Sequence, residues 1–109
     1  MTYSEITQML GLTGCPYAYD HFPNNIAPNP PYIVFNFPES NDFGADNKNY
    51  VSIDTINIEL YVKPANLFEE QQTVEAILDD YGFFYEKNEA YITKEDLYQI
   101  SYVSQVITE

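Results

Sequence analysis

The sequence of 109 residues contains no arginine, one cysteine and one histidine, and only four of its residues are lysines. Seventeen acidic residues give the chain a formal charge of −13. Such a surface repels phosphates, and without arginine the usual bidentate phosphate clamp is missing. These absences argue against autonomous binding of DNA, RNA or an anionic membrane.

Cys15, as the only cysteine, rules out an internal disulfide and a four-cysteine zinc site, which fits a reducing, intracellular setting. The first residues lack the basic region of a signal peptide, and no apolar run approaches the about 20 residues that cross a bilayer. We therefore expect a soluble, cytoplasmic protein. Its length and its 45% hydrophobic content suit one folded domain, 1–109, with a single core.

Eleven tyrosines and seven phenylalanines exceed what one small core can hold. Some aromatic side chains are therefore expected at the surface, where tyrosine supplies contact area for a partner at a low entropic cost. Strand propensity is the alternative explanation. It accounts without any partner for Tyr32, Tyr50, Tyr98 and Tyr102.

The N-terminal segment predicts a short helix. Thr2 and Glu5 form a capping-box pattern, and Gly11 is placed to end the helix. Its apolar face comprises Ile6, Met9 and Leu10. Prolines and asparagines then fill Leu12–Pro31, which predicts a long loop without a regular element. The aromatic residues expected to pin this loop to the body are Tyr17, Tyr19 and Phe22.

Alternating apolar residues predict a central strand with one buried face over Ser52–Lys63. Tyr32–Phe37, rich in β-formers and flanked by prolines, predicts the first strand, and a polar loop, Pro38–Asn49, follows. Tyr50–Ile53 starts another strand, with its apolar residues at odd positions. The buried positions of the central strand are even, and this change of parity predicts a bulge or a turn near Asp54.

The segment Leu67–Tyr81 has helical spacing of its apolar residues, with Asn66 and Glu69 as a capping pattern and Gly82 just beyond its end. Its apolar stripe comprises Leu67, Val74, Ile77, Leu78 and Tyr81. The remaining elements are a short strand, a turn, a two-residue β segment and a long final strand, at Phe83–Lys87, Asn88-Glu89, Tyr91-Ile92 and Tyr98–Val106. The order α-β-β-β-α-β-β predicts an α+β fold, a mainly antiparallel sheet with two helices packed on one face.

Residues that could carry chemistry are few. Asp20 and His21 could form a carboxylate–imidazole pair, and Cys15 with His21 a thiol–imidazole pair, but no nucleophile motif accompanies either. The acidic residues Asp42 and Asp46 flank Gly44 without the spacing of a calcium loop, and no glycine-rich phosphate loop is present. We therefore expect no catalytic residue, no cofactor and no metal ion.

Five segments carry a resemblance to a known family: PPYIVFNF, NDFGADNKNY, INIELYVK, NLFEEQQTVEAILDDYG and LYQISYVSQV. In this order they resemble the tail-completion or tail-terminator proteins, which join head and tail, of long-tailed bacteriophages and prophages of Gram-positive bacteria. The resemblance runs from the first helix to the last strand. It implies a structural protein without enzyme activity, assembled in the host cytoplasm and located in the virion at the tail–neck junction.

The resemblance also implies partners. Copies of the chain would form a ring, commonly a hexamer, that caps the major tail tube protein and meets a neck or head-closure protein. DNA would pass through its lumen unbound, which an acidic wall favours. Neighbouring copies would cover the sheet edges, and the long loops would contact tube and neck. Phe43, Asp46 and Asn47 are the predicted partner-contact residues.

Two alternatives stay open. An acidic DNA-mimic inhibitor of a host nucleic-acid enzyme would also carry this charge, although mimics tend to line carboxylates along one face, whereas here they are dispersed from Glu5 to Glu109. Another neck component, such as a head-closure protein, is the second. Competition with DNA for an enzyme would favour the mimic, and ring formation with tube protein would favour the terminator.

Overall fold

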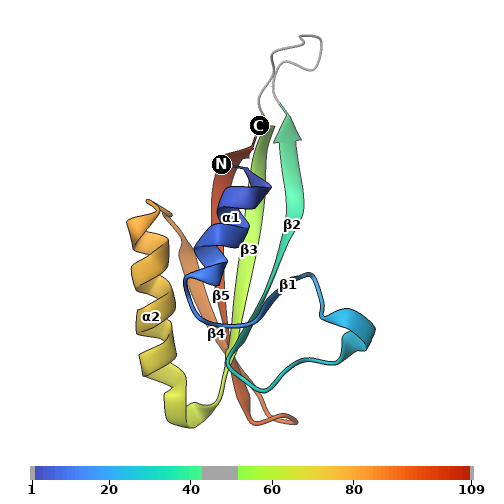
Figure 1. Ribbon diagram of the computed structural model, residues 1–109, viewed down its shortest axis with the longest axis vertical. Coiled ribbons are helices and arrows are strands. Elements are labelled where there is room, and N and C mark those ends of the chain that lie inside the picture. Colours follow the sequence, from blue (N-terminus) through green and yellow to red (C-terminus); the bar gives the residue numbers. More distant parts are fainter. Residues whose placement is uncertain (1, 43–51, 109) are drawn as a thin grey trace.

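The computed structural model describes residues 2–42 and 52–108. A single five-stranded sheet has the order β1-β2-β3-β5-β4; β1 is parallel to β2 and all other neighbours are antiparallel. Both helices lie on one face of this sheet (Figure 1). The elements are α1 (Tyr3–Gly11), β1 (Tyr17–Tyr19), η1 (Pro23–Asn25), β2 (Tyr32–Asp42), β3 (Ser52–Val62), η2 (Pro64–Asn66), α2 (Leu67–Asp80), β4 (Glu86–Ile92) and β5 (Leu97–Thr108).

The predicted α+β class and the order α-β-β-β-α-β-β are confirmed, but the strands that fill the order differ. The segment Leu12–Pro31 was expected to hold no regular element, and it contains β1 and η1. β1 forms because Tyr17–Tyr19 pairs in parallel with Ile33–Phe35, a long-range contact that local composition does not encode. The strands predicted at Tyr50–Ile53 and Ser52–Lys63 are one strand, β3, over the described residues.

The central position of β3 follows from its apolar alternation. It pairs along its whole length with β5 on one side, and with β2 on the other. Its helix-facing side chains are buried to within 1% exposure: Ile56, Ile58, Leu60 and Val62. Ile33 and Phe35 of β2 and Ile100 of β5 lie beside them in register and complete the sheet side of the core. A two-residue period therefore builds one side of a single hydrophobic core.

α1 covers the first part of the core on the helix side of the sheet. The Glu5 backbone N–H donates to Thr2 Oγ1 over 3.2 Å and the Thr2 N–H donates to Glu5 Oε1 over 3.1 Å, so the predicted capping box is present. The Thr2 N–H also holds the pKa of Glu5 below its usual value. The buried face of the helix comprises Ile6, Met9 and Leu10, as predicted.

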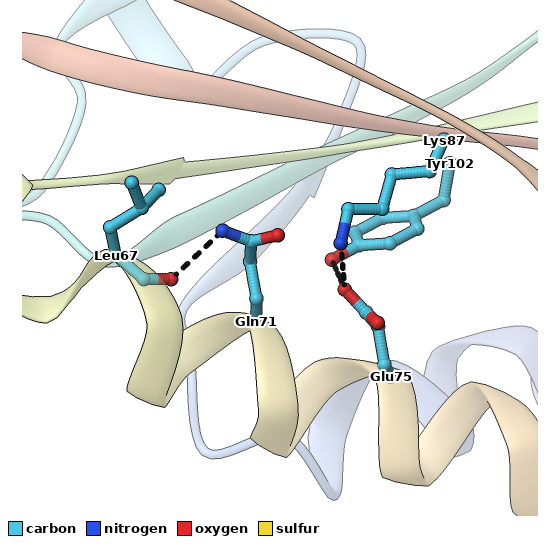
Figure 2. A network of polar contacts seen from close by, with 5 residues as sticks. All are labelled: Leu67, Gln71, Glu75, Lys87 and Tyr102. Atoms are coloured by element: carbon cyan, nitrogen blue, oxygen red, sulfur yellow. Dashed lines mark hydrogen bonds and ion pairs between the residues drawn. The ribbon is translucent and has the colours of Figure 1, made fainter.

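α2 covers the second part of the core, with Val74 and Leu78 fully buried. Gln71 extends the stripe because its Nε2 donates to the Leu67 carbonyl over 3.1 Å, which satisfies a buried amide (Figure 2). The helix ends in a Schellman motif, in which the Gly82 and Phe83 N–H groups donate to the Asp79 and Leu78 carbonyls over 3.0 Å. Gly82, at φ +73°, is the residue that permits it, as predicted.

Three local predictions are wrong. The Asn66 side chain makes no capping bond, because the turn η2 leads into α2 instead. Asn88 and Glu89 form no turn; β4 runs through them, and the turn lies at residues 93–96, with Asp96 at φ 51°. β3 has no bulge near Asp54: the register shift lies in β2, between Asn36 and Glu39, across from Ile56.

The strand predicted at Tyr32–Phe37 is longer than expected, since β2 continues to Asp42 and takes up the start of the predicted Pro38–Asn49 loop. Aromatic contacts join Leu12–Pro31 to the sheet, as expected for two of the three named residues, Tyr19 and Phe22. Tyr19 packs edge-on against Phe35 at 5.3 Å between ring centroids, and Phe22 packs in the same way on Tyr32 at 5.5 Å.

Candidate interaction surfaces

The predicted contact residues Phe43, Asp46 and Asn47 lie outside the described residues, between β2 and β3, so their role stays a prediction. The predicted Asp20–His21 pair forms, with 3.0 Å between Asp20 Oδ2 and His21 Nδ1, and both side chains are exposed. It borders a cavity of about 290 Å³ that Phe22 and Tyr61 also line. No serine, threonine or cysteine lines this cavity, so the pair faces no candidate nucleophile there.

Cys15 does not complete a thiol–imidazole pair. Its side chain belongs to the hydrophobic core, whereas the His21 ring is exposed. Burial raises the pKa of the Cys15 thiol, which disfavours the thiolate that nucleophilic chemistry requires. Within residues 2–42 and 52–108, no group of three or more histidine, cysteine or acidic side chains could hold a metal ion. No helix in that part of the chain is long and apolar enough to cross a membrane.

The helix-free face of the sheet carries a polar network across β3 and β5. Gln99 Nε2 donates to Glu59 Oε2 over 2.6 Å and to the Tyr61 hydroxyl over 2.9 Å. Burial raises the pKa of Glu59; a hydrogen bond with the Asn57 side chain partly opposes this effect, and the nearby carboxylate of Asp20 adds to it. Burial likewise raises the pKa of Tyr61. Glu59 is the one formally charged member of these three side chains.

Two asparagines continue this face toward the β2 bulge. Asn36 and Asn57 are direct partners in the β2–β3 ladder. The Oδ1 atom of each is buried without a hydrogen-bond partner. Buried acceptors normally find a donor, and at such a site an ordered water would supply one.

On the helix side, polar contacts fasten α2 to the last two strands. Glu75 Oε2 accepts from the Tyr102 hydroxyl of β5 over 2.8 Å and pairs with Lys87 Nζ of β4 over 2.9 Å (Figure 2). Burial, followed by the hydrogen bond to Glu75, raises the pKa of Tyr102. The carboxylate thus satisfies the one polar atom that Tyr102 carries into the core.

A groove lies where β4 stops short of the end of β5. The β4 ladder covers β5 only as far as Val103, and no other described strand pairs with β5 on that side. The groove measures about 840 Å³ and runs between β5 and the chain that links α2 to β4. We call it the β5 groove. Its main lining residues are Tyr81, Phe83, Phe84, Tyr85, Val106 and Ile107.

Several of these aromatic and aliphatic side chains are open to solvent. Phe84 is 92% exposed and Ile107 is 51% exposed, whereas Phe83 is buried in the core. The prediction that surplus aromatics reach the surface is confirmed. The groove itself was not predicted. The sequence signal that could have indicated it was the run of three aromatic residues, 83–85, directly after the helix.

No protein-family model matches the sequence, and no curated protein matches it. A chain in the solved structure of the virion of a native gene transfer agent particle has a similar fold. The two chains are 16% identical and superpose with a TM-score of 0.58, over 91% of this chain and 82% of the other. At this identity, the likeness shows that the two chains share a fold.

Proposed function

We propose that this protein is a structural component of a phage-like virion. The observation that carries the proposal is the fold shared with a protein of a gene transfer agent virion, over 91% of this chain and 82% of the other. The site geometry agrees with it. The described residues offer open strand edges and exposed aromatic side chains, and the one carboxylate–imidazole pair lacks a nucleophile beside it.

More specifically, the protein acts as a tail terminator. Copies form a ring, a hexamer on the tail, that caps the major tail tube protein and joins it to a neck or head-closure protein. The sheet supports this role at both of its margins: β1 at one margin spans three residues, and among the described strands none pairs with the outer edge of β4 at the other. Edges of this kind are covered in stable assemblies, here by the neighbouring copies.

Charge supports the same role. A formal charge of −13 without arginine gives a ring wall that repels phosphates, so DNA passes through the lumen unbound. Such mutual repulsion would also keep free subunits apart until the tail tip offers a surface. The ring therefore assembles on the tube in the host cytoplasm and remains in the virion at the tail–neck junction.

Deleting the gene tests the proposal. Electron microscopy of the resulting lysates is expected to show heads separated from tails whose length is no longer uniform, and complementation is expected to restore both defects. Tails of normal length on joined heads would contradict it, and so would purified virions that lack the polypeptide. Normal tails with unjoined, leaking heads would assign the chain to head closure instead.

The predicted contact residues allow a finer test. Phe43→Ala combined with Asp46→Ala is expected to impair tail length or head joining in the same complementation assay. Phe68→Ala with Glu69→Ala, an exposed aromatic and an exposed acid on α2, is the matched control. Equal complementation by both double variants would remove Phe43 and Asp46 from the interface. Competition of the purified chain with DNA for a host enzyme would favour the DNA-mimic alternative.

A further inference from the structure

The cavity that Asp20 and His21 border lies on the helix-free face of the sheet, where β2 begins and β3 ends. It measures about 290 Å³, with Tyr32 and Tyr61 of the sheet on one side and residues of the segment 20–27 on another. We call it the Tyr32 pocket. Ligand sites commonly measure about 300–1,000 Å³, so this pocket suits a single side chain or an equally small ligand.

The Tyr32 side chain brings a polar atom without a partner to this pocket. The residue is 9% exposed, and its ring stacks on Tyr61 with 4.9 Å between ring centroids. Its hydroxyl makes no hydrogen bond within the part of the chain that the structure describes, whereas the Tyr61 hydroxyl accepts from Gln99 Nε2. Buried polar groups normally have a partner, so the Tyr32 hydroxyl marks a place for a polar ligand.

The rim of the pocket is acidic. Asp20 and Glu95 line it, and His21, the one lining residue that can carry a positive charge, already contacts Asp20. Glu95 makes no ion pair among the described residues, not even with its neighbour Lys94. Burial raises the pKa of Tyr32 and the Glu95 carboxylate adds to this effect, which indicates that the carboxylate lies near the hydroxyl. A cation complements such a rim.

The wall across from the sheet is preformed. The Asp20 N–H donates to the Phe35 carbonyl over 2.8 Å, and the Asn25 N–H donates to the Phe22 carbonyl over 2.9 Å. The Phe22 ring packs edge-on against Tyr32. Because these contacts fix the segment in the free chain, a ligand has little loop ordering to bring about, which lowers the free-energy cost of binding.

The walls and the rim together favour one kind of cation. A planar guanidinium stacks on aromatic rings and donates in several directions to hydroxyl and carboxylate oxygens, whereas an ammonium is a compact, strongly hydrated charge. This chain has no arginine, so a second copy cannot supply a guanidinium, and its formal charge of −13 would repel the first. Charge and shape therefore select a different chain.

We propose that the Tyr32 pocket binds an arginine side chain of a partner protein. The guanidinium lies against the aromatic side of the pocket, donates to the Tyr32 hydroxyl and pairs with the Glu95 carboxylate. This inference does not rest on the proposed virion role, since it follows from the cavity, the free hydroxyl and the rim charge alone.

NMR titration of the full chain with three blocked pentapeptides tests it. Their central residue is arginine, lysine or citrulline, the neutral analogue of arginine, and glycines flank it. The arginine peptide is expected to shift the ring signals of Tyr32 and Tyr61, with half-saturation on the order of 1 mM and weaker binding as salt is added. The lysine peptide is expected to bind about threefold more weakly, and the citrulline peptide about tenfold more weakly.

Two variants locate the site. Tyr32→Phe keeps the ring and is expected to weaken binding of the arginine peptide by about threefold, without lowering the thermal stability of a chain in which the hydroxyl has no partner. Glu95→Gln is expected to weaken it by about threefold at low salt. The matched controls are Tyr98→Phe and Glu89→Gln. These residues pair with Val62 and Ile100 on the helix side of the sheet, and their variants are expected to bind as the wild type does.

Three results would overturn the proposal. The first is the absence of shifts at Tyr32 and Tyr61 up to about 10 mM arginine peptide, or equal binding of the arginine peptide and either of the other two. The second is wild-type binding by Tyr32→Phe and Glu95→Gln, or equal losses in these variants and their controls. The third is a dimer of the chain alone in analytical ultracentrifugation that Glu95→Gln dissociates, which would make the occupant a second copy.

Discussion

Tyr102 and Glu75 meet across the core, where the phenol hydroxyl in the middle of β5 donates to a carboxylate in the middle of α2 over 2.8 Å. Tyr102 is 1% exposed, and its hydroxyl reaches the partly exposed edge of the helix, where Lys87 pairs with the same carboxylate oxygen. One carboxylate thus joins three elements that are distant in sequence. Its removal leaves a buried donor without an acceptor, which costs more than the net gain from the bond.

The first prediction concerns this pair. Glu75→Ala is expected to lower the free energy of unfolding by about 1–3 kcal/mol, because the Tyr102 hydroxyl stays buried without an acceptor. Tyr102→Phe removes the hydroxyl itself, so no buried donor is left without an acceptor. It should lower the free energy of unfolding by about 1 kcal/mol. In urea denaturation, the double variant should lose less than the sum of the two single losses. Strict additivity would show that the two residues do not interact.

The second prediction is alkaline sensitivity. The pKa of Tyr102 in the folded state lies above the ordinary value of 10.0, so the folded state holds this proton more tightly than the unfolded state does. The stability that this tighter proton binding contributes is fully present below pH 10 and is lost as the pH rises toward the folded-state pKa. Between about pH 9 and pH 11, the Tyr102→Phe variant should therefore lose less stability than the wild type.

The control for this measurement is Tyr91→Phe. The hydrogen bond to Asp96 also raises the pKa of Tyr91, but this ring is half exposed and solvent screens its interaction. Tyr91→Phe should therefore change the slope of the unfolding free energy against pH less than Tyr102→Phe does. Identical slopes for the wild type and both variants would show that the Tyr102 proton is not linked to folding.

The third prediction concerns Glu59 on the helix-free face. Burial raises its folded-state pKa above 4.5, so its contribution to stability is present below pH 4.5 and is lost as the pH rises through the folded-state pKa. Glu59 therefore contributes less stability at pH 7 than at a pH below 4.5. Glu59→Gln keeps an acceptor for Gln99 and should raise the urea midpoint at pH 7, but not at about pH 4. A gain that is equal at both pH values would point to packing instead of charge.

The fourth prediction compares two glycines. Gly82, at φ +73°, closes α2, and Gly82→Ala is expected to cost about 1 kcal/mol of stability from the backbone conformation alone, since an added Cβ meets nothing within 4 Å. Gly11 is the matched control. A Cβ there would make an ordinary contact with Tyr17 at 3.9 Å, so Gly11→Ala in the last turn of α1 should be neutral or stabilising. Equal effects in thermal denaturation would contradict this account of the helix ends.

The fifth prediction concerns the charge at the α2 C-terminus. Asp79→Asn with Asp80→Asn should raise the free energy of unfolding by about a few tenths of a kcal/mol, because two anions leave the negative end of the helix dipole. Urea denaturation at low salt measures this change, since salt screens the interaction with the helix end. A loss of stability would show that these carboxylates stabilise the fold.

Much of the local structure follows from short-range patterns. The Thr2–Glu5 capping box and the Gly82 helix end depend on residues within one or two turns, so the sequence predicted them correctly. The Asn66 cap failed because Pro64 starts a 3₁₀ turn there, and the turn predicted at Asn88 failed because pairing with β5 holds that residue in β4. Tertiary pairing overrides local preference where the two compete.

The sequence by itself determined the class of fold, the buried faces of α1 and β3, most of the buried face of α2, and a surface that repels phosphates, because periodicity and charge are properties of the chain alone. Only the tertiary structure decided which strands are neighbours, where β4 stops along β5, and that the exposed Phe84 lies beside Ser104 of β5. Those features depend on backbone hydrogen bonds between segments distant in sequence, and no local pattern in either strand records the length over which the two will pair.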